Sequence, residues 1–154
     1  MGRRVVKKVY KDTYARGQRD EKEFKDRYQV KIDLISIKVL EDRDLLGNVS
    51  ELYFRVGRRP SYSSRIPNRG TMNLEKNEIY QPLDGLTIYT EFRDAPKGGV
   101  VQVPFHVFER DPAKNDDIIV DQELAIPLGS SDYEVITQNS VKIKLKLSAL
   151  ITRY

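Results

Sequence analysis

The sequence contains no cysteine and no tryptophan, and a single histidine among its 154 residues. Without cysteine the chain can form no disulfide, no zinc–thiolate site and no thiol nucleophile. No glycine-rich phosphate loop follows an expected strand and no nucleophile elbow is present, so the common enzyme motifs are missing. We therefore predict a non-enzymatic protein that requires no cofactor. The lack of cysteine also fits an intracellular protein.

Long apolar runs are missing as well. No segment approaches the roughly 18 apolar residues of a helix that crosses a bilayer. The first residues, Met-Gly-Arg-Arg-Val-Val-Lys-Lys, are charged and lead into no apolar stretch, unlike a signal peptide. Gly2 lies outside a myristoylation motif, because Val6 stands where the motif requires Ser or Thr. We expect a protein with no transmembrane segment, either soluble or bound peripherally to a membrane.

The net charge of +4 arises in the first 30 residues, which hold ten Lys and Arg against five Asp and Glu. Residues 1–27 are too polar to form a core, so we predict an extended basic arm there. We expect this arm either to bind an anionic surface, such as nucleic acid or lipid headgroups, or to insert into a protein assembly; the alternative is a disordered tail that keeps the protein soluble. The arm residues that we expect to contact a partner are Arg3, Arg4, Lys7, Lys8 and Lys11.

Residues 28–154 are expected to form one globular domain, since the chain is 39% hydrophobic and 32% charged. Short alternating runs separated by Gly, Pro and Asp turns predict about eight strands and no helix. A phase change at Leu34-Ile35 predicts a bulge in the first strand. The fold class is therefore all-β, an eight-stranded antiparallel β-sandwich. The expected strands are residues 28–41, 52–56, 71–80, 86–93, 100–108, 118–128, 133–137 and 140–148.

Three charged stretches are candidate binding sites. An acidic loop lies between Phe108 and Ile118, and a second one spans residues 41–51. Closely spaced carboxylates can bind calcium, although turns are often acidic for no further reason. The connection 57–70 is basic and is either a phosphate-binding loop or a mobile surface loop. In the last strand, Val141, Ile143, Leu145 and Leu147 are expected to face the core, and Val101, Val103, Phe105 and Val107 share one face of residues 100–108. The lysines of the last strand either bind anions, form a solvated face or protect a sheet edge from aggregation. The predicted anion- or lipid-binding residues are Arg58, Arg59, Arg65, Arg69, Lys142, Lys144 and Lys146.

The order of these motifs resembles a C2 domain over residues 28–150. The stretch from Asp44 through Gly47 and Ser50-Glu51 to Tyr53 is similar to the first calcium loop of that family. The stretch Val107-Phe-Glu-Arg-Asp111, followed by Asp117-Ile118, is similar to the third loop. The final Val-Lys-Ile-Lys-Leu-Lys-Leu is similar to the last strand. The resemblance implies a sandwich with its calcium loops at one end and the ligands Asp44, Glu51, Glu109, Asp111 and Asp117.

Departures from the C2 pattern weaken the implied calcium site. Glu51 and Glu109 stand where the family has aspartate, and Val120 stands where it has glycine. Each extra methylene moves a carboxylate outward, and calcium sites depend on the number and placement of their ligands. Calcium is thus the one candidate cofactor, and we expect its binding to be weak or lost.

The leading functional prediction is a non-enzymatic C2-like interaction module that docks on an anionic membrane surface or a protein partner. An alternative is a structural component of a large assembly, with a sandwich body and a basic arm that orders on binding. Nucleic-acid contact through the arm is a further alternative, although Tyr10 and Tyr14 alone offer little base stacking.

Overall fold

The computed structural model describes residues 26–40, 49–58 and 64–152. Most of the described chain lies in strands, with one short 3-10 helix, η1 (Lys97–Gly99). The predicted all-β class is confirmed, with ten strands rather than eight. They are β1 (Arg27–Val39), β2 (Val49–Val56), β3 (Ser64–Ile66), β4 (Met72–Glu75), β5 (Ile79–Tyr80), β6 (Leu86–Asp94), β7 (Val100–Glu109), β8 (Asp117–Pro127), β9 (Ser131–Gln138) and β10 (Val141–Thr152).

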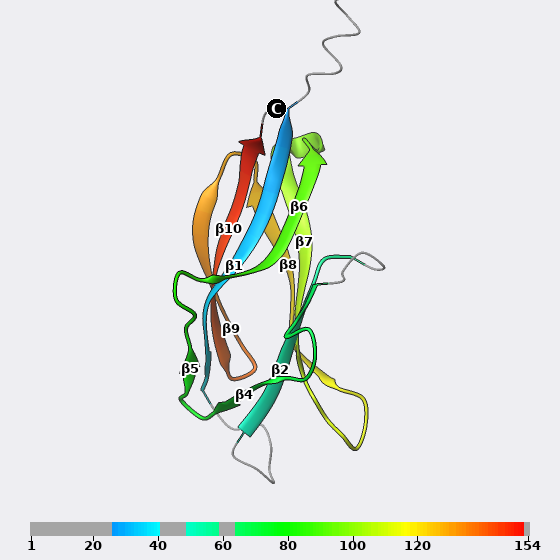
Figure 1. The fold of residues 1–154 in the computed structure, drawn as a ribbon. Helices are drawn as coiled ribbons and strands as arrows, with labels where there is room; N and C mark the ends of the chain where they lie inside the picture. Colours follow the sequence, from blue (N-terminus) through cyan, green and yellow to red (C-terminus); the bar gives the residue numbers. More distant parts are fainter. Residues whose placement is uncertain (1–25, 41–48, 59–63, 153–154) are drawn as a thin grey trace, which may run out of the picture.

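The strands form two antiparallel sheets that pack face to face (Figure 1). Sheet A has the order β5-β1-β10-β9, with β6 also paired to β1. Sheet B has the order β3-β2-β7-β8, with β4 also paired to β2. No described helix is long and apolar enough to span a bilayer. The predicted arm residues Arg3, Arg4, Lys7, Lys8 and Lys11 lie outside the described part of the chain.

Alternating apolar residues fill the space between the sheets. In β10 the predicted inward set is buried, and so is the corresponding set in β7, because successive strand residues point to opposite faces. Phe54 and Phe105 meet in the core with their ring centroids 5.9 Å apart. The buried sets are Val141, Ile143, Leu145 and Leu147 in β10, and Val101, Val103, Phe105 and Val107 in β7.

The predicted bulge in β1 is present. The register between β1 and β10 shifts between Leu34 and Ser36, so one extra residue, Ile35, stands in β1. The alternation then resumes with Ile37 and Val39 buried. Lys38 consequently lies on the outer face of sheet A.

Other sequence-based expectations require correction. The segment expected to be one strand, residues 71–80, divides into β4 in sheet B and β5 in sheet A. Asn77, with a φ of 67°, lies in the turn between them and lets the chain cross from one sheet to the other. The connection 57–70 contains a short edge strand, β3. The lysine-bearing strand β10 lies between β1 and β9, so its lysines do not protect a sheet edge.

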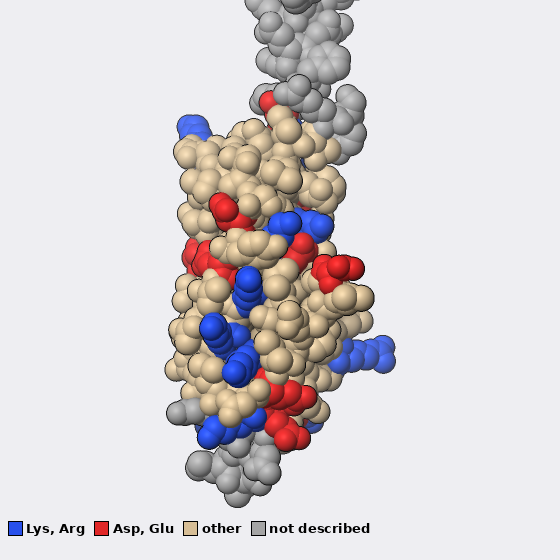
Figure 2. Space-filling view, turned by 90° about the vertical axis from the view of Figure 1, so that its left-hand side faces the viewer, with Lys and Arg blue, Asp and Glu red and all other residues tan. Residues whose placement is uncertain are grey.

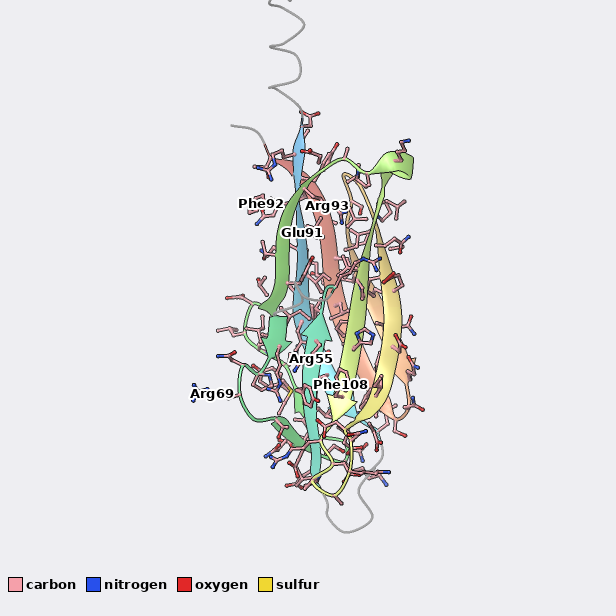
Figure 3. The ribbon with its side chains drawn as sticks, turned by 90° about the vertical axis from the view of Figure 1, so that its right-hand side faces the viewer. Arg55, Arg69, Glu91, Phe92, Arg93 and Phe108 are labelled. Atoms are coloured by element: carbon pink, nitrogen blue, oxygen red, sulfur yellow. The ribbon has the colours of Figure 1, made fainter. Side chains whose placement is uncertain are left out.

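Strand β6 carries charged side chains at the opposite side of sheet A from β9. Glu91 lies opposite the buried Val30 and accepts a hydrogen bond from the Tyr89 hydroxyl at 2.6 Å. Arg93 Nη1 is 3.7 Å from Glu91 Oε1. Figure 3 shows Glu91, Phe92 and Arg93 close together on this strand.

Candidate functional site

The loop between β7 and β8 holds the acidic residues that suggested a calcium site. The Asp111 amide donates to Asp116 Oδ1 at 3.0 Å, and the Ala113 amide donates to Asp111 Oδ1 at 2.9 Å. The Tyr53 hydroxyl donates to Asp116 Oδ2 at 2.5 Å. Both loop carboxylates are thus hydrogen-bonded to groups of the protein itself.

These contacts shift the pKa values of two groups. The hydrogen bond from Tyr53, together with the backbone amide of Asp111, holds the pKa of Asp116 below its usual value. Burial, reinforced by the hydrogen bond to Asp116, raises the pKa of Tyr53 to about 12. The pair therefore favours a neutral phenol beside an ionised carboxylate.

The predicted calcium ligands are only partly brought together. Glu109 and Asp117 lie opposite each other across β7 and β8, and Glu109 is 8% exposed. Arg110 Nη1 is 3.6 Å from Glu51 Oε1, and Lys114 Nζ is 3.8 Å from Asp111 Oδ2. Among the described residues, no three Asp, Glu, His or Cys side chains form a group that could hold a metal.

Asp44, the remaining predicted ligand, lies outside the described residues. The described carboxylates do not provide by themselves the several oxygen ligands that calcium takes. Calcium binding at this end of the sandwich stays a prediction.

The outer face of sheet B carries an aromatic and arginine cluster. Tyr53 and Phe108 stack with ring centroids 5.1 Å apart and an interplanar angle of 8°. The Arg65 guanidinium lies 4.1 Å from the Tyr53 ring centroid, and Arg65 donates to the carbonyl of Pro67 at 2.6 Å. His106 Nε2 is 3.1 Å from Asp121 Oδ1 on the same face.

The predicted arginine group is divided by these contacts. Arg58 donates to Glu123 Oε1 at 3.2 Å, and Arg65 is held by Tyr53 and Pro67. Arg69 points away from the body of the sandwich (Figure 3). Arg59 lies outside the described residues.

The outer face of sheet A carries the lysines of β10. Lys142 and Lys144 are exposed and Lys146 is half-buried, between the buried residues of that strand. Lys38 of β1 lies directly opposite Lys142. Like charges directly opposite each other in neighbouring strands are destabilising, because their side chains start about 5 Å apart. We call Lys38, Lys142, Lys144 and Lys146 the lysine face.

The positive charge of the lysine face is little neutralised by nearby carboxylates. The centroid of the Tyr133 ring on β9 lies 4.9 Å from Lys144 Nζ and 5.9 Å from Lys146 Nζ. Within the described ranges no carboxylate forms an ion pair with the three lysines of β10. Asp33, opposite Lys146, instead accepts a hydrogen bond from Thr87 at 2.7 Å. Figure 2 shows blue side chains gathered in a column on this side of the molecule.

The predicted anion-binding residues therefore lie on opposite faces of the sandwich. The lysines of β10 are on the outer face of sheet A, whereas Arg58 and Arg65 belong to the side of sheet B. One flat surface cannot contact both groups at once. Sequence reasoning did not select Lys38, although the phase change in β1 was a signal that this residue points outward.

No protein-family model and no curated protein matches the sequence. Among solved structures, human GIVD cytosolic phospholipase A2 in complex with methyl gamma-linolenyl fluorophosphonate matches with a TM-score of 0.55 and 10% identity. The match covers 84% of this chain and 18% of that one, so this chain spans less than a fifth of the enzyme's length. The matched part is the enzyme's C2 domain, so the match gives no support for enzymatic activity.

Isolated C2 domains match over most of their length. A solved C2 domain has a TM-score of 0.49 and 13% identity, covering 79% of this chain and 97% of that chain. A C2 domain of plant Extended Synaptotagmin 1 has a TM-score of 0.47 and 14% identity, covering 82% and 95%. At such low sequence identities, structural similarity indicates a shared fold and nothing about function. With its two antiparallel sheets and its match to the phospholipase domain, the chain has a C2-like β-sandwich fold.

Proposed function

We propose that this chain is a non-enzymatic docking module that binds an anionic membrane surface through the lysine face of sheet A. The observation that carries the proposal is the placement of Lys38 directly opposite Lys142, beside Lys144 and Lys146. This arrangement costs stability in the free protein. Phosphate groups above the face would relieve the repulsion.

The number of lysines on the lysine face determines its affinity for an anionic membrane. Each basic group near an anionic membrane contributes about 1 kcal/mol, so the four lysines supply about 4 kcal/mol. That free energy corresponds to a dissociation constant of about 1 mM. Docking through one lysine face is therefore weak, and it falls steeply as salt screens the charges.

The outer face of sheet B is a poorer candidate for this role. Arg58 is paired with Glu123, and Arg65 is committed to the Tyr53 ring and the Pro67 carbonyl. Binding phosphate there would exchange existing contacts for new ones. Calcium is dispensable in this proposal, because Tyr53, Arg110 and Lys114 already neutralise or bind carboxylates of the acidic loops.

The test is vesicle co-sedimentation with the acidic lipid content varied. The double variant Lys142→Gln, Lys144→Gln should weaken binding about thirtyfold, since two charges are lost. The control, Lys97→Gln with Lys114→Gln, changes the net charge equally at η1 and at the loop between β7 and β8, away from the lysine face, and should leave binding nearly unchanged. Equal losses in both variants would show that net charge alone drives binding and would refute the assigned face. Adding EDTA should leave binding unaltered.

A further inference from the structure

Strand β9 is an edge strand of sheet A among the described residues, and it lacks lysine, proline and bulges. It is eight residues long, Ser-Asp-Tyr-Glu-Val-Ile-Thr-Gln, and contains no lysine, arginine or proline. Within the described part of the chain it is the last strand of sheet A. Tyr133 is 60% exposed and Val135 is 52% exposed. Natural edge strands usually carry lysines, prolines, bulges or inward-pointing charges that block pairing with another chain. The charged residues of β9 are Asp132 and Glu134, and its register with β10 is regular throughout.

The turn between β9 and β10 determines which backbone groups face outward. Asn139 and Ser140 both have positive φ, 48° and 68°, as in a two-residue type I′ hairpin loop. The flanking pair, Gln138 and Val141, then exchanges both hydrogen bonds, and the pattern alternates along the strand. The amides and carbonyls of Tyr133, Val135 and Thr137 consequently point away from β10, toward the open edge.

We propose that β9 pairs antiparallel with β9 of a second copy, with Val135 opposite Val135 of that copy. In this register Tyr133 lies opposite Thr137, an aromatic beside a β-branched residue, which is a favourable cross-strand pair. Glu134 lies opposite Ile136, so no carboxylate faces another. Three residue pairs then exchange two main-chain hydrogen bonds each.

One of the two neighbouring registers is clearly less favourable. A shift that places Tyr133 opposite Val135 of the second copy also places Glu134 opposite Glu134. Two like charges directly opposite each other destabilise a strand pair. The sequence of β9 is thus self-complementary in the Val135-centred register, which is why a second copy is the occupant that fits this edge.

The pairing has a consequence that rests on the proposed function. Residues opposite each other in an antiparallel pair lie on the same face of the sheet. The lysine faces of the two copies would therefore form one surface. Two linked sites bind with an avidity well above that of one, which compensates for the weak docking of a single face.

Cysteine cross-linking tests the register, and the absence of native cysteine makes it specific. Residues in a hydrogen-bonded antiparallel pair have Cα atoms about 5.5 Å apart, within the range that a disulfide spans. Val135→Cys should give a covalent dimer under mild oxidation. Ile79→Cys is the matched control, because Ile79 is 51% exposed but lies on β5, and it should stay monomeric. Equal cross-linking of both variants, or of neither, would contradict the proposed pairing.

Analytical ultracentrifugation without lipid tests the pairing separately from membrane docking. The native protein should dimerise with rising concentration. Val135→Lys places two lysines opposite each other and should raise the dimer dissociation constant about fivefold, whereas Val135→Thr should leave it nearly unchanged. The Lys142→Gln, Lys144→Gln variant should still dimerise even if lipid docking fails. A native protein that stays monomeric up to about 1 mM, or a dimer that Val135→Lys leaves intact, would overturn the proposal.

Discussion

Replacing Lys38 by glutamate should change stability and membrane docking in opposite directions. Lys38 lies directly opposite Lys142, so Lys38→Glu converts a repulsive cross-strand pair into an attractive one. Each such pair is worth about 0.2–1 kcal/mol, so removing the repulsion and adding the attraction should stabilise the fold by about 1 kcal/mol. Docking should weaken about thirtyfold, because the charge of the lysine face falls by two.

Urea denaturation at low salt measures the gain in stability, and vesicle co-sedimentation measures the loss of docking. The gain should shrink at about 0.5 M salt, where the Debye length is only a few ångströms. Lys97→Glu is the control, because it makes the same charge change in η1 and should leave stability nearly unaltered. If Lys38→Glu lowers stability at low salt, or leaves docking intact, the lysine face is not a strained anion-binding surface.

Three further substitutions test the packing and the acidic loop. Tyr53→Phe removes the hydrogen bond to Asp116 and should lower the free energy of unfolding by about 1 kcal/mol near neutral pH. Because folding lowers the pKa of Asp116, this difference from the native protein should disappear at acid pH, where the carboxylate is protonated; urea titrations at several pH values measure it. Phe105→Ala, which empties a fully buried core position, should cost about 3–5 kcal/mol in denaturant unfolding. Gly85→Ala should lower the free energy of unfolding by about 1 kcal/mol or more, and it should lower the melting temperature more than Gly98→Ala does. Both glycines have positive φ, but an added Cβ would lie 3.3 Å from the Ile35 side chain at Gly85 and within 4 Å of no atom at Gly98. A Gly98→Ala loss as large as that of Gly85→Ala would show that the contact adds nothing.

The parts of the fold that follow from local alternation were predictable from the sequence. The inward sets of β7 and β10 were assigned correctly because the two-residue period of a strand is a local property. The break at Asn77 was missed, since residues 71–80 look like one strand until the chain crosses between sheets. C2-like loop and strand motifs gave the architecture, although the two shortest strands, β3 and β5, left no clear pattern.

The candidate site was less predictable, because it depends on long-range pairing. The opposition of Lys38 and Lys142 joins the first and last strands of the sandwich, and no local pattern encodes that register. The arginines of residues 57–70 illustrate the converse problem. Their charge was evident, yet the packing of Arg65 against Tyr53 and the bond of Arg58 to Glu123 are tertiary contacts that a single sequence does not reveal.

The ion pair between Glu91 and Arg93 on β6 affects whether further copies of the chain can pair with the other edge of sheet A. Glu91 lies on the side of β6 that faces the core and is paired with Arg93, so a strand added at this edge would have to bury or break an ion pair, whereas β9 carries carboxylates alone. The other strand on that side, β5, has only two residues. A pair formed through β9 uses the same edge of both copies, and a two-fold arrangement of that kind leaves no equivalent edge free. A dimer formed in this way would be a closed unit that cannot grow into a filament through β9.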